Sequence, residues 1–150
     1  MNKNVPLTIM GEQTPKVVIF KSESHKLCEA FNVAEGQTIL KGMPVALDED
    51  GNITPYKGGE DEVYLGIAIT DNVNPAYRAQ RNFPVEVTVM VEAYAVVHFA
   101  SKGAVNPGFV KPLGTTNKAY TEVEQADDAT KFVCIDAADE AGQILRVLVR

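Results

Sequence analysis

The clearest hydrophobic pattern in the chain is an alternation over residues 85–92, Val-Glu-Val-Thr-Val-Met-Val-Glu. Valine occupies every odd position, and mostly polar residues occupy the even ones. Side chains on a β-strand point alternately to its two faces, so this segment is predicted to be a strand with a buried valine face. The alternation breaks near Ala93, and residues 94–99 predict a second strand or a bent continuation of the first.

Several other short segments have the composition of strands. Residues 42–56 predict a hairpin around an Asp-Gly turn, because Gly and Asn tolerate the positive φ that tight turns require. Residues 63–70 predict an apolar strand, and residues 71–82, which are polar and contain a proline, predict a loop. Residues 17–20 form a short apolar run, and residues 25–34 mix apolar and polar positions as a strand does.

No segment longer than one or two turns shows the 3.6-residue apolar period of a helix. Eleven glycines and eight prolines interrupt the chain at short intervals. Many short strands punctuated in this way are typical of a barrel or sandwich. We therefore predict an all-β fold, a small barrel or sandwich of short antiparallel strands, with residues 1–16 as an extended N-terminal arm.

The regular part of the chain resembles one module written twice, over residues 42–92 and 108–149. The first copy contains G-M-P-V-A-L, a turn, I-T-P-Y, Y-L-G-I-A-I-T-D and V-E-V-T-V-M-V. The second contains G-F-V-K-P-L, a turn at residues 114–117, A-Y-T-E-V, F-V-C-I-D-A-A-D and I-L-R-V-L-V-R. In this alignment Tyr64 matches Phe132, and Cys134 stands where the first copy has Gly66.

This repetition suggests how the chain is divided. One copy could hardly bury its own apolar face, whereas two copies can close over each other. We predict that residues 1–35 form an arm with the first strand or strands. Residues 36–150 are predicted to form the β domain that contains the repeat, either as one barrel or sandwich or as two similar β units. The alternative is that any β protein with regular turns echoes itself.

Length and charge narrow the functional class. The 150 residues suffice for one compact core or two small units sharing one. The formal net charge of the chain is −6. Residues 1–30 carry four lysines and three glutamates, a net charge of +1, so the net charge of the other 120 residues is −7. An acidic body argues against nucleic acid as a partner, because Lys and Arg drive phosphate binding. No apolar run is long enough to cross a membrane, and the N-terminus lacks the apolar stretch of a signal peptide, so we expect synthesis in a cytoplasm.

The residues able to carry chemistry are sparse and scattered. The two cysteines, Cys28 and Cys134, are predicted to be reduced and buried, with a disulfide between them as the alternative. A zinc site would need both of them together with His25 and His98, drawn from three separate strands, and partly exposed strand histidines are the preferred interpretation.

Two acidic segments contain residues of the kind that bind cations. Asp48-Glu49-Asp50-Gly51-Asn52 resembles the start of a calcium loop, and Glu60-Asp61-Glu62 follows it, but the expected bidentate acidic residue is not cleanly supplied. Both segments are interpreted as solvated turns, with a weak cation site as the alternative. Nucleophile and phosphate-binding motifs are also lacking, so no catalytic, cofactor-binding or metal-binding residue is predicted and the chain is expected not to be an enzyme.

The motifs K-G-M-P-V-A-L-D-E-D-G-N-I, Y-L-G-I-A-I-T-D and V-x-V-x-V, followed by a second copy, carry a family resemblance. This doubled pattern resembles the capsid decoration, or cement, proteins of tailed bacteriophages over roughly residues 36–150. The likeness is to turns and strands. It implies an all-β auxiliary capsid protein without catalysis that attaches to the outer face of the shell, with the major capsid protein as partner.

Within this resemblance, the expected function is a structural virion protein that binds and stabilises the capsid, with other head proteins or fibres as further partners. The candidate capsid-contact segment is Val17, Val18, Ile19 and Phe20, which would add a strand to a partner sheet. The alternative is that these residues form the first strand of the protein's own sheet. A homotrimer would suit a three-fold lattice point. The alternative function is a host-surface or glycan-binding module at the base of a phage fibre or tail.

Overall fold

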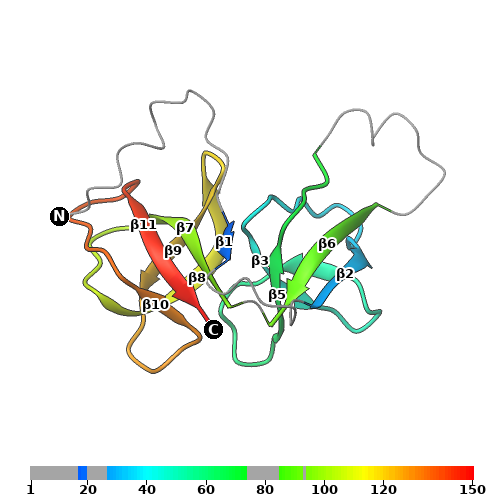
Figure 1. Cartoon of the computed structure of the whole chain (residues 1–150), viewed down its shortest axis with the longest axis horizontal. Coiled ribbons are helices and arrows are strands. Elements are labelled where there is room, and N and C mark those ends of the chain that lie inside the picture. Colours follow the sequence, from blue (N-terminus) through cyan, green and yellow to red (C-terminus); the bar gives the residue numbers. More distant parts are fainter. Residues whose placement is uncertain (1–16, 20–26, 74–84, 93) are drawn as a thin grey trace.

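The structure, a computed structural model, describes residues 17–19, 27–73, 85–92 and 94–150. These residues form eleven β-strands in two sheets and contain no helix, which confirms the predicted all-β fold. The two sheets lie side by side (Figure 1). The predicted arm, residues 1–16, lies outside the described residues, as does most of the predicted loop over residues 71–82.

The N-terminal sheet has the strand order β2-β6-β5-β3-β4. Its members are β2 (Leu27–Asn32), β3 (Pro44–Leu47), β4 (Ile53–Pro55), β5 (Val63–Ala68) and β6 (Glu86–Val91). The C-terminal sheet has the order β1-β7-β11-β10-β8-β9. Its members are β1 (Val17–Ile19), β7 (Ala95–Ser101), β8 (Gly108–Asn117), β9 (Tyr120–Gln125), β10 (Phe132–Cys134) and β11 (Ile144–Val149).

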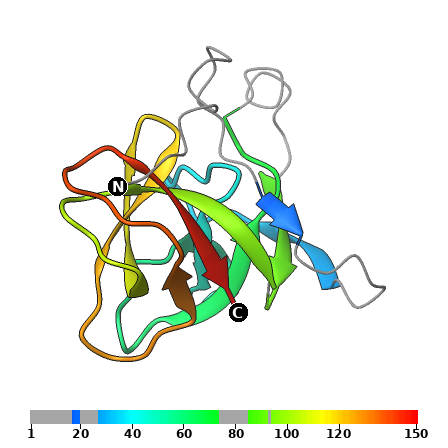
Figure 2. The same cartoon turned by 60° about the vertical axis from the view of Figure 1, so that its left-hand side comes forward.

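We call β2–β6 the N-terminal unit and β7–β11 the C-terminal unit. Their strand orders are identical when β2 is matched to β7 and each following strand to the next, with β6 matched to β11. In the C-terminal unit, a parallel pairing of β7 with β9 closes the sheet into a five-stranded barrel, which Figure 2 brings forward. In the N-terminal unit, the equivalent contact is a parallel bridge between Val33, directly after β2, and Ile53 of β4. The two units therefore share one topology.

The equivalence extends to the register of individual residues. The pairs Leu27–Val91 in the first unit and Ala95–Val149 in the second begin equivalent antiparallel ladders of β2–β6 and β7–β11. Backbone bonds outside the strands repeat as well. Ala34 N donates to Ile53 O at 3.0 Å, and Lys102 N donates to Val123 O at 2.9 Å. A shared register of this kind shows that the two halves are the same structural unit.

The register corrects the alignment made from sequence. Gly66 pairs with Val91 and Phe132 pairs with Val149, so Phe132 is equivalent to Gly66 and not to Tyr64. Cys134 is accordingly equivalent to Ala68. The difference is two residues, and a slip of two residues keeps every side chain of a strand on the same face, so a comparison of alternating apolar patterns does not detect it.

A second correction concerns the turn predicted at residues 114–117, which lie within β8. Gly114 has a φ of 74°, and the register of β8 against β9 shifts between Pro112 and Thr116. The glycine therefore forms an irregularity that bends the strand without ending it. The chain turns later, at residues 118–119, where Lys118 adopts a φ of 56°.

Other strand predictions are confirmed. Val87 and Val89 of β6 are fully buried, as the alternation predicts, and β3 pairs with β4 in the expected hairpin. One apolar cluster fills the N-terminal unit, with Ile39 and Ile53 among its buried members. A second cluster fills the C-terminal barrel and also includes Ile67 of the N-terminal unit, so the two units share a buried contact.

Candidate functional site

Three aromatic side chains meet where the two units pack together. The ring centroids of Tyr56 and Tyr64, from the N-terminal unit, lie 5.1 Å apart. Phe132 of β10 lies 5.5 Å from Tyr64 and 6.2 Å from Tyr56, and its other neighbour is Phe99 of β7, at 6.2 Å. Phe132 is 2% exposed. We call Tyr56, Tyr64, Phe99 and Phe132 the aromatic junction, because they link the interior of the barrel to the neighbouring unit.

Burial at this junction changes the chemistry of both tyrosines. Burial raises the pKa of Tyr64 well above its ordinary value, and the neighbouring Tyr56 side chain adds a smaller effect in the same direction. The Tyr64 hydroxyl is buried and has no hydrogen-bond partner among the described residues. Burial also raises the pKa of Tyr56, with Glu62 adding to the effect. Both phenols are therefore neutral at physiological pH, and their rings act as packing groups at the junction.

A cleft of about 420 Å³ opens beside the aromatic junction. One wall comes from the segment between β4 and β5, with Tyr56, Glu60 and Tyr64, and the other from residues 126–132 and β8. The volume falls within the range of small-ligand sites. The lining is mixed, with aromatic rings, carboxylates and the ammonium groups of two lysines.

The first wall is held in shape by the carboxylate of Glu62. It accepts backbone hydrogen bonds from Gly59 N at 2.8 Å and from Lys57 N at 3.1 Å. Gly58 adopts a φ of 78°, and a Cβ there would lie 2.9 Å from the carbonyl oxygen of Pro112 in the other unit. The loop thus approaches the C-terminal unit so closely that glycine is needed at this position.

The lysines of the cleft already have partners. The ammonium group of Lys111 lies 3.2 Å from the carboxylate of Glu124, and that of Lys131 lies 5.8 Å from the centre of the Tyr64 ring. A cation over an aromatic face is attracted by the ring quadrupole. Both contacts fix the position of groups at the edge of the cleft.

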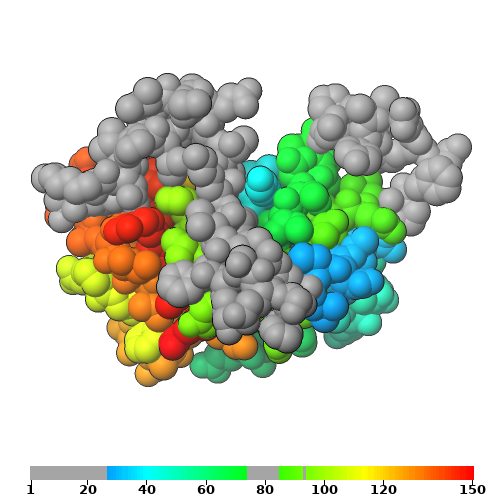
Figure 3. Space-filling view, in the orientation of Figure 1, coloured from blue at the N-terminus to red at the C-terminus, as the bar shows by residue number. Residues whose placement is uncertain are grey.

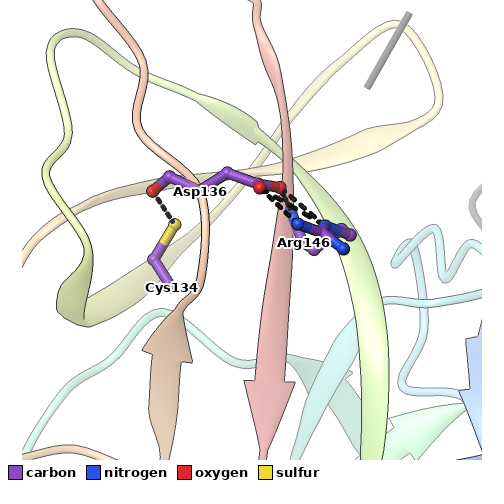
Figure 4. A network of polar contacts seen from close by, with 3 residues as sticks. All are labelled: Cys134, Asp136 and Arg146. Atoms are coloured by element: carbon purple, nitrogen blue, oxygen red, sulfur yellow. Dashed lines mark hydrogen bonds and ion pairs between the residues drawn. The ribbon is translucent and has the colours of Figure 1, made fainter. Parts of the chain in front are cut away.

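On another part of the C-terminal unit, Asp136 ties the end of β10 to β11 (Figure 4). Its carboxylate accepts two bonds from the Arg146 guanidinium, at 2.8 and 3.1 Å, and one from Arg146 N at 2.8 Å. Its backbone oxygen accepts a bond from the Cys134 thiol at 3.1 Å. The hydrogen bond and charge of Asp136 raise the pKa of Arg146. These contacts are made within the fold and join the end of β10 to β11.

The three described residues weighed for a zinc site, Cys28, His98 and Cys134, are not brought together. Cys134 is buried in β10, and burial raises the pKa of its thiol to about 11. Cys28 is exposed on β2, which contradicts its predicted burial, because β2 is an edge strand. Both thiols are free, so the alternative of a disulfide is wrong. His98 lies half-buried in β7, as predicted, and His25 lies outside the described residues.

In the acidic turn at residues 48–52, the Asp48 carboxylate accepts hydrogen bonds from the backbone of the turn itself. Asp48 accepts hydrogen bonds from Asp50 N at 2.9 Å and from Asn52 N at 2.8 Å. The carboxylate of Glu62, in the second acidic segment, is used in the same way. Within the described ranges, no three His, Cys, Asp or Glu side chains lie close enough together to hold a metal ion.

The candidate capsid-contact segment forms strand β1 for three of its four residues. Val17, Val18 and Ile19 pair antiparallel with Val97, Val96 and Ala95 of β7. This is the arrangement of the second alternative, a strand of the protein's own sheet. Phe20 lies outside the described residues. Contact of this segment with a partner stays a prediction.

Sequence reasoning missed the aromatic junction. Tyr56 and Tyr64 lie on either side of a loop, and Phe132 is far along the chain, so no local motif joins them. The signal that could have found them is their departure from the repeat. The equivalents of Tyr56, Tyr64 and Phe132 are Ala126, Thr130 and Gly66, and such differences between duplicated units are expected where the units meet.

No protein-family model matches the chain, and no curated protein matches its sequence. In the part of the chain that the structure describes, there is no helix of the length and apolar character that a membrane span requires.

Proposed function

We propose that this protein is a structural virion protein that binds the outer surface of a tailed-phage capsid and stabilises the shell. The observation that carries the proposal is the duplicated unit. The motifs on which the sequence resemblance rests lie on β3, β5 and β6 and again on β8, β10 and β11, at equivalent places in two units of one topology. The doubling of the motif is thus a doubling of the fold.

The architecture suits reinforcement of a lattice. The two units share a buried aromatic junction, so they present their outer surfaces as one body. A body that binds the assembled shell and not its separate subunits stabilises the shell by mass action, by about 2.7 kcal/mol at a free concentration 100 times Kd. The major capsid protein is the proposed partner, and the virion surface is the proposed location.

Co-sedimentation tests the proposal directly. The purified chain is mixed with intact virions and with capsids stripped of auxiliary proteins, and bound protein is measured after centrifugation. We expect saturable binding to the stripped shells and a higher temperature of DNA release from them. Absence of binding to the shells would overturn the proposal. A truncation that removes residues 1–20 tests the segment at Val17–Ile19, since loss of binding is expected only if this segment contributes to attachment.

The cleft at the aromatic junction favours a second candidate, a glycan-binding module at a phage fibre or tail base. Its volume of about 420 Å³ falls in the range of small-ligand sites, and its lining by Tyr56, Tyr64, Glu60 and Thr130 combines rings with polar groups. Binding to purified cell envelopes but not to capsids would support this candidate. Substitution of Glu60, a cleft residue outside the aromatic junction, by Gln should then weaken envelope binding and leave capsid binding unchanged.

A further inference from the structure

Among the described residues, the first strand of each unit differs in its outer edge: another strand pairs with this edge in the C-terminal unit, and none does in the N-terminal unit. In the C-terminal unit, β1 pairs with β7 along Ala95–Val97. The equivalent residues of the N-terminal unit are Leu27–Glu29 of β2. Among the described residues, β2 pairs with β6 on one side and ends its sheet on the other.

The register shows which backbone groups face this open edge. Val33 N donates to Val85 O at 2.8 Å, and the equivalent Ser101 N donates to Gln143 O at 2.9 Å. In an antiparallel ladder, residues alternate between bonding to one neighbour and to the other. Phe31, Glu29 and Leu27 therefore bond toward β6, and the N–H and C=O groups of Cys28 and Ala30 point to the open edge.

Side-chain burial shows the same difference between the units. Leu27 is 58% exposed and Glu29 is exposed, whereas their equivalents Ala95 and Val97 are fully buried. In the space-filling view, β2 lies in blue on the surface of the N-terminal unit (Figure 3). An exposed edge with unpaired backbone groups is a template for an added strand.

We propose that the edge of β2 binds an extended segment of a partner protein in the way that the edge of β7 binds β1. The chain contains one β1 segment for two equivalent edges. If a second copy donated its own β1, it would leave its β7 uncovered, so exchange between copies adds no pairing. No second segment among the described residues covers the β2 edge, so we assign the strand that would cover it to a different chain.

The chemistry of the missing strand follows from its counterpart and from the charge of the edge. The segment on β7 is Val-Val-Ile, flanked in the sequence by Lys16 and Lys21. The edge on the N-terminal unit carries an acidic residue that its equivalent lacks, since exposed Glu29 stands where the C-terminal unit has Val97. We infer an apolar, β-branched segment with basic flanks. This inference rests on the repeat and does not depend on the capsid proposal.

The test uses a labelled peptide with the sequence of residues 15–22 as the probe and the full chain as the receptor. We expect saturable binding by fluorescence anisotropy. Ala30→Pro removes an edge N–H that β6 does not use and should weaken binding at least tenfold, while Ala30→Val keeps the N–H and should bind as the parent does. Circular dichroism checks that both variants are folded.

A cross-link locates the peptide without relying on the proline variant. Val18 lies opposite Val96, the equivalent of Cys28, so a peptide carrying Val18→Cys should form a disulfide with Cys28 under mild oxidation more readily than one carrying Val17→Cys.

Three results would overturn the inference. The first is no binding to the parent chain, and the second is binding that survives Ala30→Pro in the folded variant or gives no preferred cross-link. The third is a concentration-dependent dimer, lost in Ala30→Pro, that assigns the edge to a second copy. Capsid co-sedimentation is a separate measurement, so either proposal can fail alone.

Discussion

Replacement of Phe132 by Ala is the most direct test of the aromatic junction. Phe132 is 2% exposed and contacts Tyr56, Tyr64 and Phe99, so its removal leaves a cavity between the two units. A buried Phe→Ala change costs about 3–5 kcal/mol in the free energy of unfolding. For a chain of this length, 1 kcal/mol lowers Tm by about 2–4 °C, so we expect a decrease of roughly 6–20 °C.

The matched control is Val133→Ala, one residue further along the same strand. Val133 is half-buried, so it should lose only about 1 kcal/mol. Both variants are unfolded in urea and followed by circular dichroism and by tyrosine fluorescence. The chain has five tyrosines and no tryptophan, and two of the tyrosines, Tyr56 and Tyr64, lie at the junction, so part of the fluorescence signal comes from the junction.

The same experiment tests whether the junction makes the two units cooperative. We expect the parent chain to unfold in one transition with coincident probes, and Phe132→Ala to separate the two probes. The reasoning is refuted if Phe132→Ala costs no more than Val133→Ala. In that case the ring contacts do not hold the units together.

Three further predictions concern single positions. Tyr64→Phe removes a buried hydroxyl that lacks a partner among the described residues, so it should leave stability unchanged or raise it by about 1–3 kcal/mol in urea unfolding; a loss would reveal a bound water or partner. Gly66→Ala would place a Cβ against the carbonyl oxygen of Met90 and should destabilise the chain by about 1–3 kcal/mol, and an unchanged midpoint would contradict the close approach. Cys28 should react with a thiol reagent at pH 8 within the folded chain, whereas Cys134, with its pKa raised to about 11, should react only after unfolding; two fast thiols would be inconsistent with the burial of Cys134.

The sequence predicted the fold class and most of the strands because their signals are local. Alternation over residues 85–92 needs only the two-residue period of a strand, and the hairpin before it needs only a turn that tolerates positive φ. The wrong predictions concern features that local sequence signals do not determine. The turn expected at residues 114–117 is a bulge in β8, since a glycine with positive φ can bend a strand as well as end it.

The exposure of Cys28 and the aromatic junction could not be predicted from the sequence, because both depend on neighbours that are distant in the chain. Whether Cys28 is covered depends on whether another strand lies beside β2, and composition does not determine strand order. Tyr56, Tyr64 and Phe132 become neighbours only when the two units pack, so the cleft that they border has no motif.

The differences between the two units explain how a duplicated fold can hold together. Where the N-terminal unit places Tyr56 and Tyr64 at the junction, the C-terminal unit has Ala126 and Thr130, and where the C-terminal unit places Phe132, the N-terminal unit has Gly66. Each large side chain thus has a smaller residue at the equivalent position of the other unit, and removal of the rings without replacement would leave a cavity at the junction. Exchanging Gly66 and Phe132 in one double variant should therefore destabilise the chain more than Phe132→Ala alone, because the new ring at position 66 would meet the Met90 backbone.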